Sequence, residues 1–499
     1  MHLTYLALLF MTVFEVVLST RESREDRRKP PHIVLILADD LGWNDVGWHN
    51  PEVKMPVLNQ LAADGVIFNQ AYVQPTCTPT RAALMSGYYP FKTGNQHQLL
   101  LNLHPGGLPL RFKTLPQRLK DVGYLTHIVG KWHLGFCKEA FLPTNRGFDS
   151  FYGGLTLGTS HFSKMNGILS TPGYDFYDNS GVVPQTNDYL AFMLADRAVK
   201  IINGHYQEYP LFMYFSMDVP AKSPEVPPEY EALYANITDD RTRRFYGKLS
   251  VMDDAVGSVV DALKKRDMWD DTLLIFIGDN GALASSSGSN WPLRGIAATL
   301  FEGATRVPAF IHGNMLKQTG YENNELWHIV DLHKTILSLA GAESSCEIDG
   351  MDMWDTFSKN ESSPRNEIVY NIDDDPISPG AAIRVGDYKL IAGNPDLFYP
   401  LRLINQSDGW FNYGDVPTSG LPVLPTGDEP PPPNVTYLFN VIDDPEERNN
   451  IADDHPEIVQ ALRQRLDEHR IYYMPAVNQV FDEAGDPSNF DGVFSPGWC

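Results

Sequence analysis

Residues 32–38 have the sequence HIVLILA, and Asp39 and Asp40 follow them directly. An almost continuous apolar segment of this length is typical of a parallel β-strand that is buried on both faces. A second such segment, TLLIFI at residues 272–277, leads into two further polar residues, Asp279 and Asn280. Open α/β sheets place their active sites at the carboxyl ends of the strands. Each polar end alone would also fit an ordinary turn, but the pair predicts a parallel sheet with a functional edge.

The segments around these two strands alternate between strand-like and helix-like patterns. Further strands are expected at residues 124–129, 210–215 and 307–311, and helices at residues 114–122, 241–266 and 326–340. In the longest of these helices the apolar residues are spaced by three and four, so we expect one of its faces to pack on the sheet. The alternation predicts an α/β fold, a three-layer sandwich with a mostly parallel central sheet.

The sequence changes character from about residue 373. Strands are expected at residues 381–392 and 436–441, on either side of a long polar insertion rich in Pro and Gly, and a helix is expected at residues 455–469. We therefore predict a large α/β domain at residues 30–372 and a smaller C-terminal α+β domain at residues 373–499.

The N-terminal segment, residues 1–20, is apolar, contains Glu15 and is followed by a densely charged stretch. It is too short and too poorly flanked for a membrane span, so we expect a cleaved secretory signal peptide; an uncleaved anchor is the alternative. Four N-x-S/T sequons fit the secretory pathway as well, at Asn236, Asn360, Asn405 and Asn434. We expect a lysosomal or extracellular protein with no stable membrane span.

The overall composition narrows the range of partners. The chain has 499 residues, of which 43% are hydrophobic and 20% are charged, as in an ordinary globular protein. Its formal net charge of -24 argues against a nucleic-acid partner. A polyanionic substrate would need a locally basic cleft.

Residues 77–87, CTPTRAALMSG, form the most distinctive pattern in the chain. Thr78 is expected to cap a short helix, with Pro79 at its first position and Gly87 at its end. Cys77 would then lie just outside the helix N-terminus, where backbone N–H groups favour anions. From these residues alone, a buried structural cysteine beside a surface ion pair of Arg81 is the simpler interpretation.

The pattern Cys77-x-Pro79-x-Arg81, followed by Leu-Met-Ser-Gly, resembles the signature of the type I sulfatases, although Thr80 stands where that family usually has serine. In the family, the formylglycine-generating enzyme oxidises the cysteine to formylglycine, whose hydrated aldehyde is the nucleophile. The resemblance implies an alkaline-phosphatase-like fold and hydrolysis of a sulfated sugar or small-molecule sulfate ester. A phosphatase on the same fold would use serine or threonine as the nucleophile.

Two further parts of the chain resemble motifs of this family. Residues 130–135, GKWHLG, imply that Lys131 and His133 contact the substrate and the nucleophile, while Arg81 orients the nucleophile. The polar strand ends imply one Ca²⁺ per chain, held by the modified Cys77 together with Asp39, Asp40, Asp279 and Asn280. Oxygen ligands suit a hard cation such as Ca²⁺ or Mg²⁺; turn capping is the alternative explanation of these residues.

The resemblance runs nearly from end to end and is closest to the arylsulfatase B (N-acetylgalactosamine-4-sulfatase) branch of the family. Two positions depart from the family pattern. Ala297 stands where a lysine usually contacts the sulfate, and Ala221, or Lys222 if the loop shifts by one residue, stands where a histidine usually lies near the scissile oxygen. Losing one such group typically costs about 10²-fold or more in rate. We predict an active sulfatase; a weakly active or non-catalytic homologue that binds sulfated ligands is the alternative.

The chain has four cysteines, Cys77, Cys137, Cys346 and Cys499. If Cys77 is oxidised to formylglycine, three remain, so at most one disulfide forms and one thiol is left over. The sequence does not determine which two of them pair.

Overall fold

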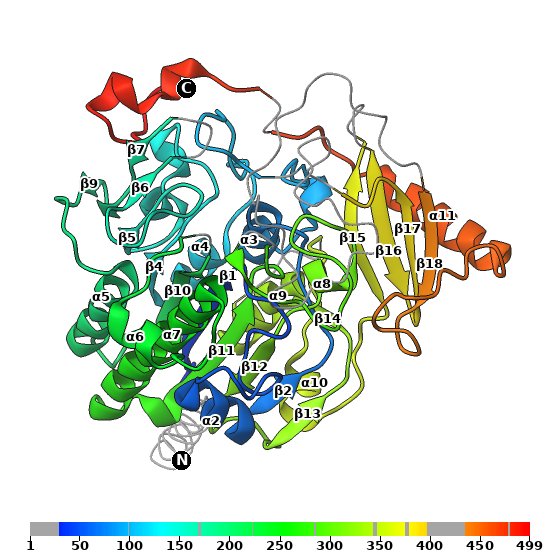
Figure 1. The fold of residues 1–499 in the computed structure, drawn as a ribbon, viewed down its shortest axis with the longest axis horizontal. Coiled ribbons are helices and arrows are strands. Elements are labelled where there is room, and N and C mark those ends of the chain that lie inside the picture. Colours follow the sequence, from blue (N-terminus) through cyan, green and yellow to red (C-terminus); the bar gives the residue numbers. More distant parts are fainter. Residues whose placement is uncertain are drawn as a thin grey trace, which may run out of the picture.

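The computed structural model describes residues 29–97, 99–167, 171–221, 223–283, 286–342, 347–374, 379–396, 435–477 and 480–499. Several predicted features lie outside these residues, namely the signal peptide at residues 1–20, Lys222, Cys346, and the sequons at Asn405 and Asn434. The described chain forms a large domain built around one sheet and a smaller sheet beside it, and the C-terminal segment lies along one end of the large domain (Figure 1).

The large sheet has ten strands in the order β13-β2-β12-β11-β1-β10-β4-β5-β8-β9. Its centre is parallel and consists of β11 (Thr272–Gly278), β1 (His32–Asp39), β10 (Leu211–Pro220), β4 (Leu125–Gly130) and β5 (Ser150–Gly153). These bounds confirm the strands predicted at residues 32–38, 124–129, 210–215 and 272–277. Because Ala38 pairs with Gly278, the carboxyl ends of β1 and β11 lie side by side.

The edges of the large sheet are mixed in direction. On one edge, β12 (Ala309–His312) runs antiparallel to both β11 and β2 (Val66–Phe68), and β13 (Tyr321–Asn323) lies outermost. On the other edge, β8 (Tyr177–Asp178) and β9 (Gly181–Val182) form a hairpin. The strand predicted at residues 307–311 therefore exists as β12, and the parallel arrangement is confined largely to the centre.

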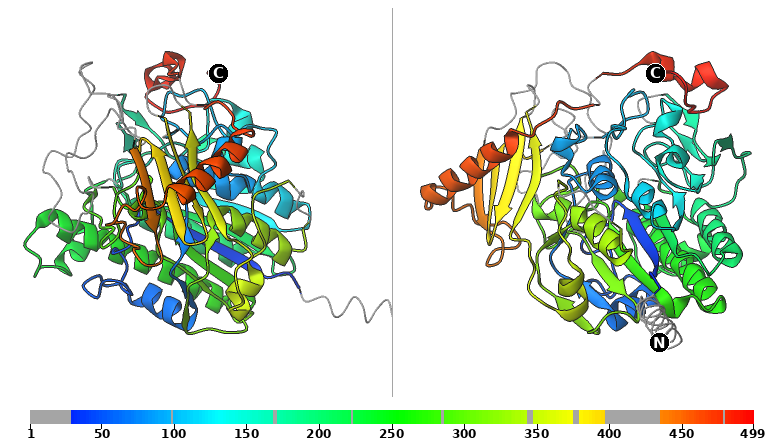
Figure 2. Two further views of the ribbon diagram at one scale, coloured as in Figure 1. Left: turned by 90° about the vertical axis from the view of Figure 1, so that its right-hand side faces the viewer. Right: turned by 180° about the vertical axis from the view of Figure 1, so that it is seen from behind.

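Helices cover both faces of the large sheet, which confirms the three-layer prediction (Figures 1 and 2). On one face, α2 (Pro56–Asp64), α5 (Leu190–Gly204) and α7 (Asp240–Lys265) share an apolar core with Val34 and Ile36 of β1. On the other face, α3 (Cys77–Ser86), α4 (Leu115–Lys120) and α9 (Ile329–Leu339) share a core with Leu35 and Leu37. Successive residues of β1 thus point into two separate cores, which explains why the strand lacks exposed polar positions.

The helix predicted at residues 326–340 begins later than expected. Trp327 and His328 instead form the short strand β14 (Trp327–His328), which pairs with β3 (Ala71–Tyr72). The His328 ring accepts the N–H of Val330, and Asp331 accepts the N–H of His328, so α9 starts at Ile329 behind a capping box. The remaining short elements are β6 (Met165–Asn166), β7 (Gly173–Tyr174), α6 (Pro228–Ala232), α8 (Glu302–Thr305) and α10 (Trp354–Lys359). Among the described residues, no helix is both long and apolar enough to cross a membrane.

The smaller sheet is antiparallel and follows the order β15 (Glu367–Asp373), β16 (Gly380–Val385), β17 (Tyr388–Gly393) and β18 (Val435–Asn440). The prediction of one strand at residues 381–392 is wrong. Gly386, with a φ of 58°, and Asp387 form a turn that folds this segment into the β16–β17 hairpin. The predicted helix at residues 455–469 is α11 (Pro456–Arg470), which lies across one face of this sheet (Figure 2).

A buried cluster of charges joins the small sheet to the large domain. The ammonium of Lys389 lies 2.9 Å from a carboxylate oxygen of Glu302 and 2.9 Å from one of Glu447. Glu302, at the start of α8, also accepts the hydroxyl of Tyr72 at 2.7 Å and that of Tyr370 at 3.2 Å. Because buried charges are costly unless they are paired, this cluster holds the two parts in one specific arrangement.

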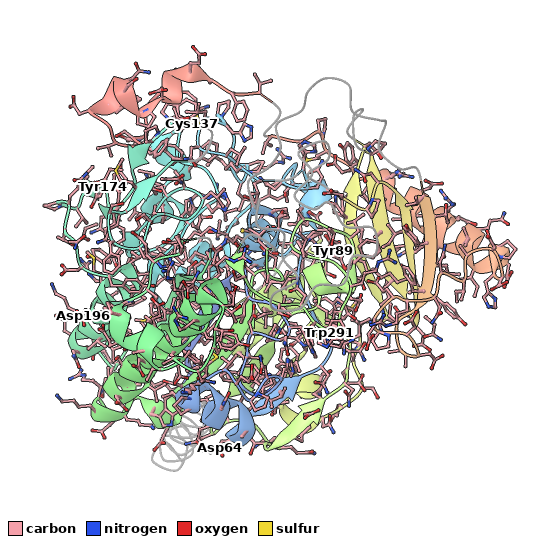
Figure 3. All side chains as sticks on the ribbon, in the orientation of Figure 1. Asp64, Tyr89, Cys137, Tyr174, Asp196 and Trp291 are labelled. Atoms are coloured by element: carbon pink, nitrogen blue, oxygen red, sulfur yellow. A yellow bond between two sulfur atoms is a disulfide. The ribbon has the colours of Figure 1, made fainter. Side chains whose placement is uncertain are left out.

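A disulfide between Cys137 and Cys499 fastens the C-terminal segment to the loop that follows residues 130–135; Figure 3 labels Cys137 beneath that segment. The same segment donates a backbone hydrogen bond from Met474 to Phe91 at 2.8 Å. Cys77 is buried and is the free cysteine among the described residues. One disulfide therefore forms, within the limit set by the cysteine count.

Candidate active site

The helix that carries Cys77 begins earlier than predicted. Cys77 is the first residue of α3, behind Thr76, which has extended backbone angles, and the helix ends at Gly87 with a φ of 78°. The prediction that Thr78 caps the helix is wrong, because the Thr78 hydroxyl has other partners. It accepts the N–H of Leu100 at 3.1 Å and lies 3.2 Å from Nε2 of His133. Cys77 consequently lies in the first turn of α3 rather than outside it.

Arg81 ties together the carboxyl ends of three strands. Its guanidinium is fully buried and donates from Nη2 to Asp279 at 2.8 Å and to Asp39 at 3.1 Å. From Nη1 it donates to the hydroxyl of Ser216 at 2.5 Å and to the carbonyl oxygen of Lys131 at 3.1 Å. The side chain therefore fixes β1, β10 and β11 relative to α3 instead of projecting into solvent.

Three carboxylates converge on the Cys77 sulfur. One ligand atom from each of Asp39, Asp40, Cys77 and Asp279 lies within 4.8 Å of the others, and all four residues are buried. Asp40 has a φ of 57°, which turns the chain sharply at the end of β1, and its N–H donates to Oδ1 of Asp279 at 3.0 Å. The structure therefore brings these residues together at one edge of the sheet, where the sequence predicted them.

The donor set around these carboxylates fits a hard cation. Asn280 donates from Nδ2 to Oδ1 of Asp40 at 2.7 Å, while its own Oδ1 is buried without a hydrogen-bond partner among the described residues. Three buried carboxylates with an unpartnered amide oxygen form an all-oxygen group that suits Ca²⁺ or Mg²⁺. A divalent cation would also offset the repulsion between the carboxylates.

The charges in this cluster are strongly coupled. Burial would raise the pKa of Asp39, but the positive charges of Lys131 and Arg81 outweigh it and hold that pKa below its usual value. Burial and the nearby charge of Asp39 raise the pKa of Asp279 to about 8. Burial, together with Asp279, also raises the pKa of the Cys77 thiol well above its usual value. Since the thiolate is the reactive form, Cys77 as a plain thiol is a poor nucleophile.

Lys131 and His133 reach the cluster from the end of β4. The ammonium of Lys131 is fully buried and donates to Asp39. His133 lies 3.0 Å through Nε2 from the carbonyl oxygen of Leu100, and its Nδ1 is buried without a partner among the described residues. Burial and the charge of Lys131 hold the pKa of His133 well below its usual value, so its ring is neutral.

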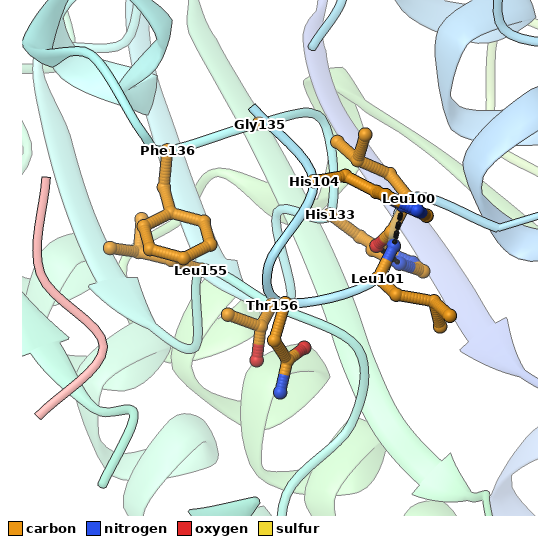
Figure 4. Close-up of a pocket in the computed structure, with 9 residues that line it drawn as sticks. Leu100, Leu101, His104, His133, Gly135, Phe136, Leu155 and Thr156 are labelled. Atoms are coloured by element: carbon orange, nitrogen blue, oxygen red, sulfur yellow. Dashed lines mark hydrogen bonds between the residues drawn. The ribbon is translucent and has the colours of Figure 1, made fainter. Parts of the chain in front are cut away.

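His133 also borders a small pocket with a volume of about 10 Å³. Figure 4 shows its ring facing this pocket beside Leu100, Leu101 and Thr156. Asn102 lines the pocket too, and both polar atoms of its buried amide lack partners among the described residues. The pocket is therefore polar on one side and apolar on the other.

The two alanines that depart from the family pattern lie in segments connected to the strand ends that carry the cluster. Pro220 pairs with Asp39, so Ala221 follows directly on the strand end beside the carboxylates. Ala297 donates its backbone N–H to the carbonyl oxygen of Ala282, a residue that closely follows Asn280 in the sequence. Both alanines are buried. Lys222, the alternative to Ala221, lies outside the described residues.

Sequence reasoning missed Asp218, which belongs to the same edge. Along β10 the side chains of Tyr214 and Ser216 both reach Arg81, and Asp218 lies close enough for the charges of Asp39, Lys131 and Arg81 to act on it. Its carboxylate is buried, and Oδ1 lacks a partner among the described residues. Burial and the charge of Asp39 raise its pKa to about 7. The only available signal was one acidic residue at the end of an apolar strand.

Comparison with known proteins places these motifs in a family. A family profile described as Sulfatase matches residues 31–342. Arylsulfatase J of Mus musculus is 36% identical over 93% of this chain and 80% of its own length. N-acetylgalactosamine-6-sulfatase of Mus musculus is 29% identical over 91% of this chain and 88% of its own length. The crystal structure of Ps i-CgsB in complex with k-i-k-neocarrahexaose matches with a TM-score of 0.76 at 27% identity, covering 93% of this chain and 97% of that one.

The chain therefore belongs to the sulfatase family and has its alkaline-phosphatase-like fold, as the resemblance around Cys77 predicted. It is accordingly a sulfuric ester hydrolase. The assignment to the arylsulfatase B branch stays a prediction.

Proposed function

We propose that the protein is a calcium-dependent sulfatase whose nucleophile is a formylglycine made from Cys77. The observation that carries this proposal is the meeting of Cys77 with three buried carboxylates, whose ligand atoms lie within 4.8 Å of one another. The oxygens of a sulfate ester repel nucleophiles, so hydrolysis requires positive charge at the sulfate. When bound, the calcium ion and the formylglycine would supply that charge and a nucleophilic oxygen.

Each residue of the cluster has a distinct role in this proposal. Arg81 keeps Asp39 and Asp279 in position, because its guanidinium bonds to both. Lys131 presents a buried positive charge to the sulfate, and His133 contributes a neutral ring whose Nδ1 has no partner among the described residues. The ion is held by residue 77 together with Asp39, Asp40, Asp279 and Asn280.

We further propose that the substrate is a sulfated sugar or a small-molecule sulfate ester. A neocarrahexaose in the Ps i-CgsB structure and the amino sugar in the name of N-acetylgalactosamine-6-sulfatase support a sugar. The disulfide and the exposed sequon residues Asn236 and Asn360 support passage through the secretory pathway to a lysosomal or extracellular location. Oxidation of Cys77 during that passage would make the formylglycine-generating enzyme a partner in maturation. The catalytic unit would span residues 30–372, with residues 373–499 as a subdomain.

The nucleophile is tested by mass spectrometry of the peptide that contains residue 77, from protein made in a secretory pathway that has the converting enzyme. We expect an aldehyde in place of the thiol, and we expect turnover of an aryl sulfate to rise with the converted fraction. Cys77→Ala is the control and should be inactive, because alanine cannot be converted. Full turnover from protein that carries only the thiol would contradict the proposal.

Calcium binding is tested through stability. A ligand present at 100 times its Kd stabilises the folded state by about 2.7 kcal/mol, so a chelator should lower the Tm and added Ca²⁺ should restore it. Asp279→Asn, which removes one carboxylate of the cluster, should weaken this response. A melting curve that does not respond to chelator would exclude a structural role for calcium.

A second function is favoured by one observation, the alanines at positions 221 and 297. They remove a proton donor and a cation that the family normally uses, which would leave a weakly active homologue that binds sulfated ligands. A substrate panel containing an aryl sulfate, galactosamine 4-sulfate and galactosamine 6-sulfate separates the two. Fully converted protein that binds one of these compounds without hydrolysing it would favour the binding function.

A further inference from the structure

Lys248 is a buried charge in the middle of α7. It is 2% exposed, and it forms no ion pair with a carboxylate among the described residues. Its ammonium instead donates three hydrogen bonds to backbone carbonyls, at 2.7 Å to Pro220, 2.8 Å to Ala221 and 2.8 Å to Ser223. Three acceptors at these distances match the three N–H donors of an ammonium, whereas a neutral amine has only two.

The three carbonyls belong to the segment that leaves β10 at the active-site edge. Pro220 is the β10 residue that pairs with Asp39, and Ala221, or Lys222 if the loop shifts by one residue, stands where the family usually has a histidine. Lys248 therefore connects α7, which covers one face of the sheet, to the backbone next to the carboxylate cluster. A substitution of Lys248 would therefore change the path of that backbone without removing a direct contact to any carboxylate.

The charge of Lys248 also acts on the cluster. Burial lowers the pKa of Lys248 to about 7 and the carboxylates of Asp40 and Asp45 raise it, so Lys248 carries its charge below neutral pH and is within electrostatic reach of both carboxylates. In a buried, low-dielectric environment such an interaction is weakly screened. Ala297 stands where the family usually has a cationic lysine, so Lys248 is a cation beside a site that lacks that one.

We propose that Lys248 is a positioning residue of this sulfatase, which fixes the segment at Pro220 and Ala221 against the cluster and supplies positive charge to the side that binds an anionic sulfate ester. This inference rests on the proposed function. It predicts two separable effects of substitution, one through the hydrogen bonds and one through the charge.

The charge effect is measured by titrating the unconverted, folded protein with Ca²⁺ in a calorimeter. Lys248→Met removes a positive charge near Asp40, so we expect the Kd for Ca²⁺ to fall by about three- to tenfold. Loosened structure alone would raise that Kd or leave it unchanged. Lys248→Arg keeps the charge and should keep the wild-type Kd.

The hydrogen-bond effect is measured by kinetics on converted protein. The N–H donors of arginine are spread over a planar fork and cannot converge on three carbonyls as a single ammonium does, so Lys248→Arg should raise the KM for an aryl sulfate about fivefold or more, with a smaller change in kcat. This variant keeps the inference testable if Lys248→Met does not fold.

Lys164 provides a matched control. Its ammonium is also buried and also donates to three carbonyls, those of Phe162, Thr186 and Asp188. Its charge interacts with Asp188 and Glu225, not with the cluster. Lys164→Met and Lys164→Arg should change stability but neither the Kd for Ca²⁺ nor the KM.

The outcomes distinguish this inference from the proposed function. Lys248 variants that match their Lys164 counterparts in both Kd and KM would overturn the positioning role while leaving the sulfatase proposal in place. Wild-type protein that binds no Ca²⁺ in either the unconverted or the converted form would overturn the calcium site itself, and the charge effect of Lys248 with it.

Discussion

Arg81→Met is expected to destabilise the protein by about 3–5 kcal/mol, because it leaves buried carboxylates without their partner. The guanidinium of Arg81 is bonded to Asp39 and Asp279, and both carboxylates are buried. Methionine fills much of the space but offers neither charge nor N–H donors. Turnover of an aryl sulfate by the folded fraction should fall by about 10³-fold, since the cluster loses its fixed geometry.

The comparison for Arg81→Met is Arg365→Met. Arg365 is also buried and paired, with Nε at 2.6 Å from a carboxylate oxygen of Asp331, but it does not contact the cluster. Chemical denaturation should show a similar loss of stability for both variants. Only Arg81→Met should lower kcat of the protein that remains folded. An Arg81→Met enzyme with wild-type kcat would show that the guanidinium does not position the site.

Ala297→Lys is expected to increase kcat/KM for an aryl sulfate by about 10²-fold, the usual value of one cationic group at a reacting centre. Ala297 is 1% exposed, and its backbone is held by Ala282 near Asn280. A lysine at this position would restore the cationic group that the family usually has there. Adding Ala221→His should increase the rate further on substrates with poor leaving groups, because these need a proton donor.

Ala297→Met is the matched control for this gain. It has nearly the length of lysine without its charge, so a gain seen only with lysine is electrostatic. If the lysine and methionine variants have equal rates while the wild-type enzyme is already fast, the missing cation has been replaced from elsewhere in the structure. In that case Lys248, whose ammonium donates to the carbonyl oxygens of Pro220 and Ala221, is the first residue to test.

The parts of the fold that could be predicted from the sequence were those with a strong local pattern. β1 and β11 are apolar throughout, since each is buried on both faces of the sheet, and their acidic ends meet as expected. Strand direction leaves no such pattern, and β12 therefore turned out to be antiparallel. The β16–β17 hairpin was missed because its turn consists of only two residues, one of them Gly386.

The candidate site was predictable only where a motif marked it. Cys77, Arg81, Lys131 and the two pairs of polar strand ends lie together as expected. The start of α3 was misplaced because Thr78, a good capping residue, bonds to Leu100 instead. Ser216, Asp218 and Lys248 were missed because their importance comes from contacts with residues far away in the sequence, which no local spacing encodes.

The depth of Cys77 sets an order of events during biosynthesis. Only 4% of this residue is exposed, and the helix that carries it shares a core with α9 and with residues of β1 and β11, which lie far apart in the chain. If Cys77 is converted to formylglycine, as we propose, an enzyme that binds the backbone around residue 77 would have to act before the chain completes its tertiary fold. We then expect protein that is refolded from denaturant without prior conversion to regain its native fold but to remain inactive, because it cannot be converted afterwards.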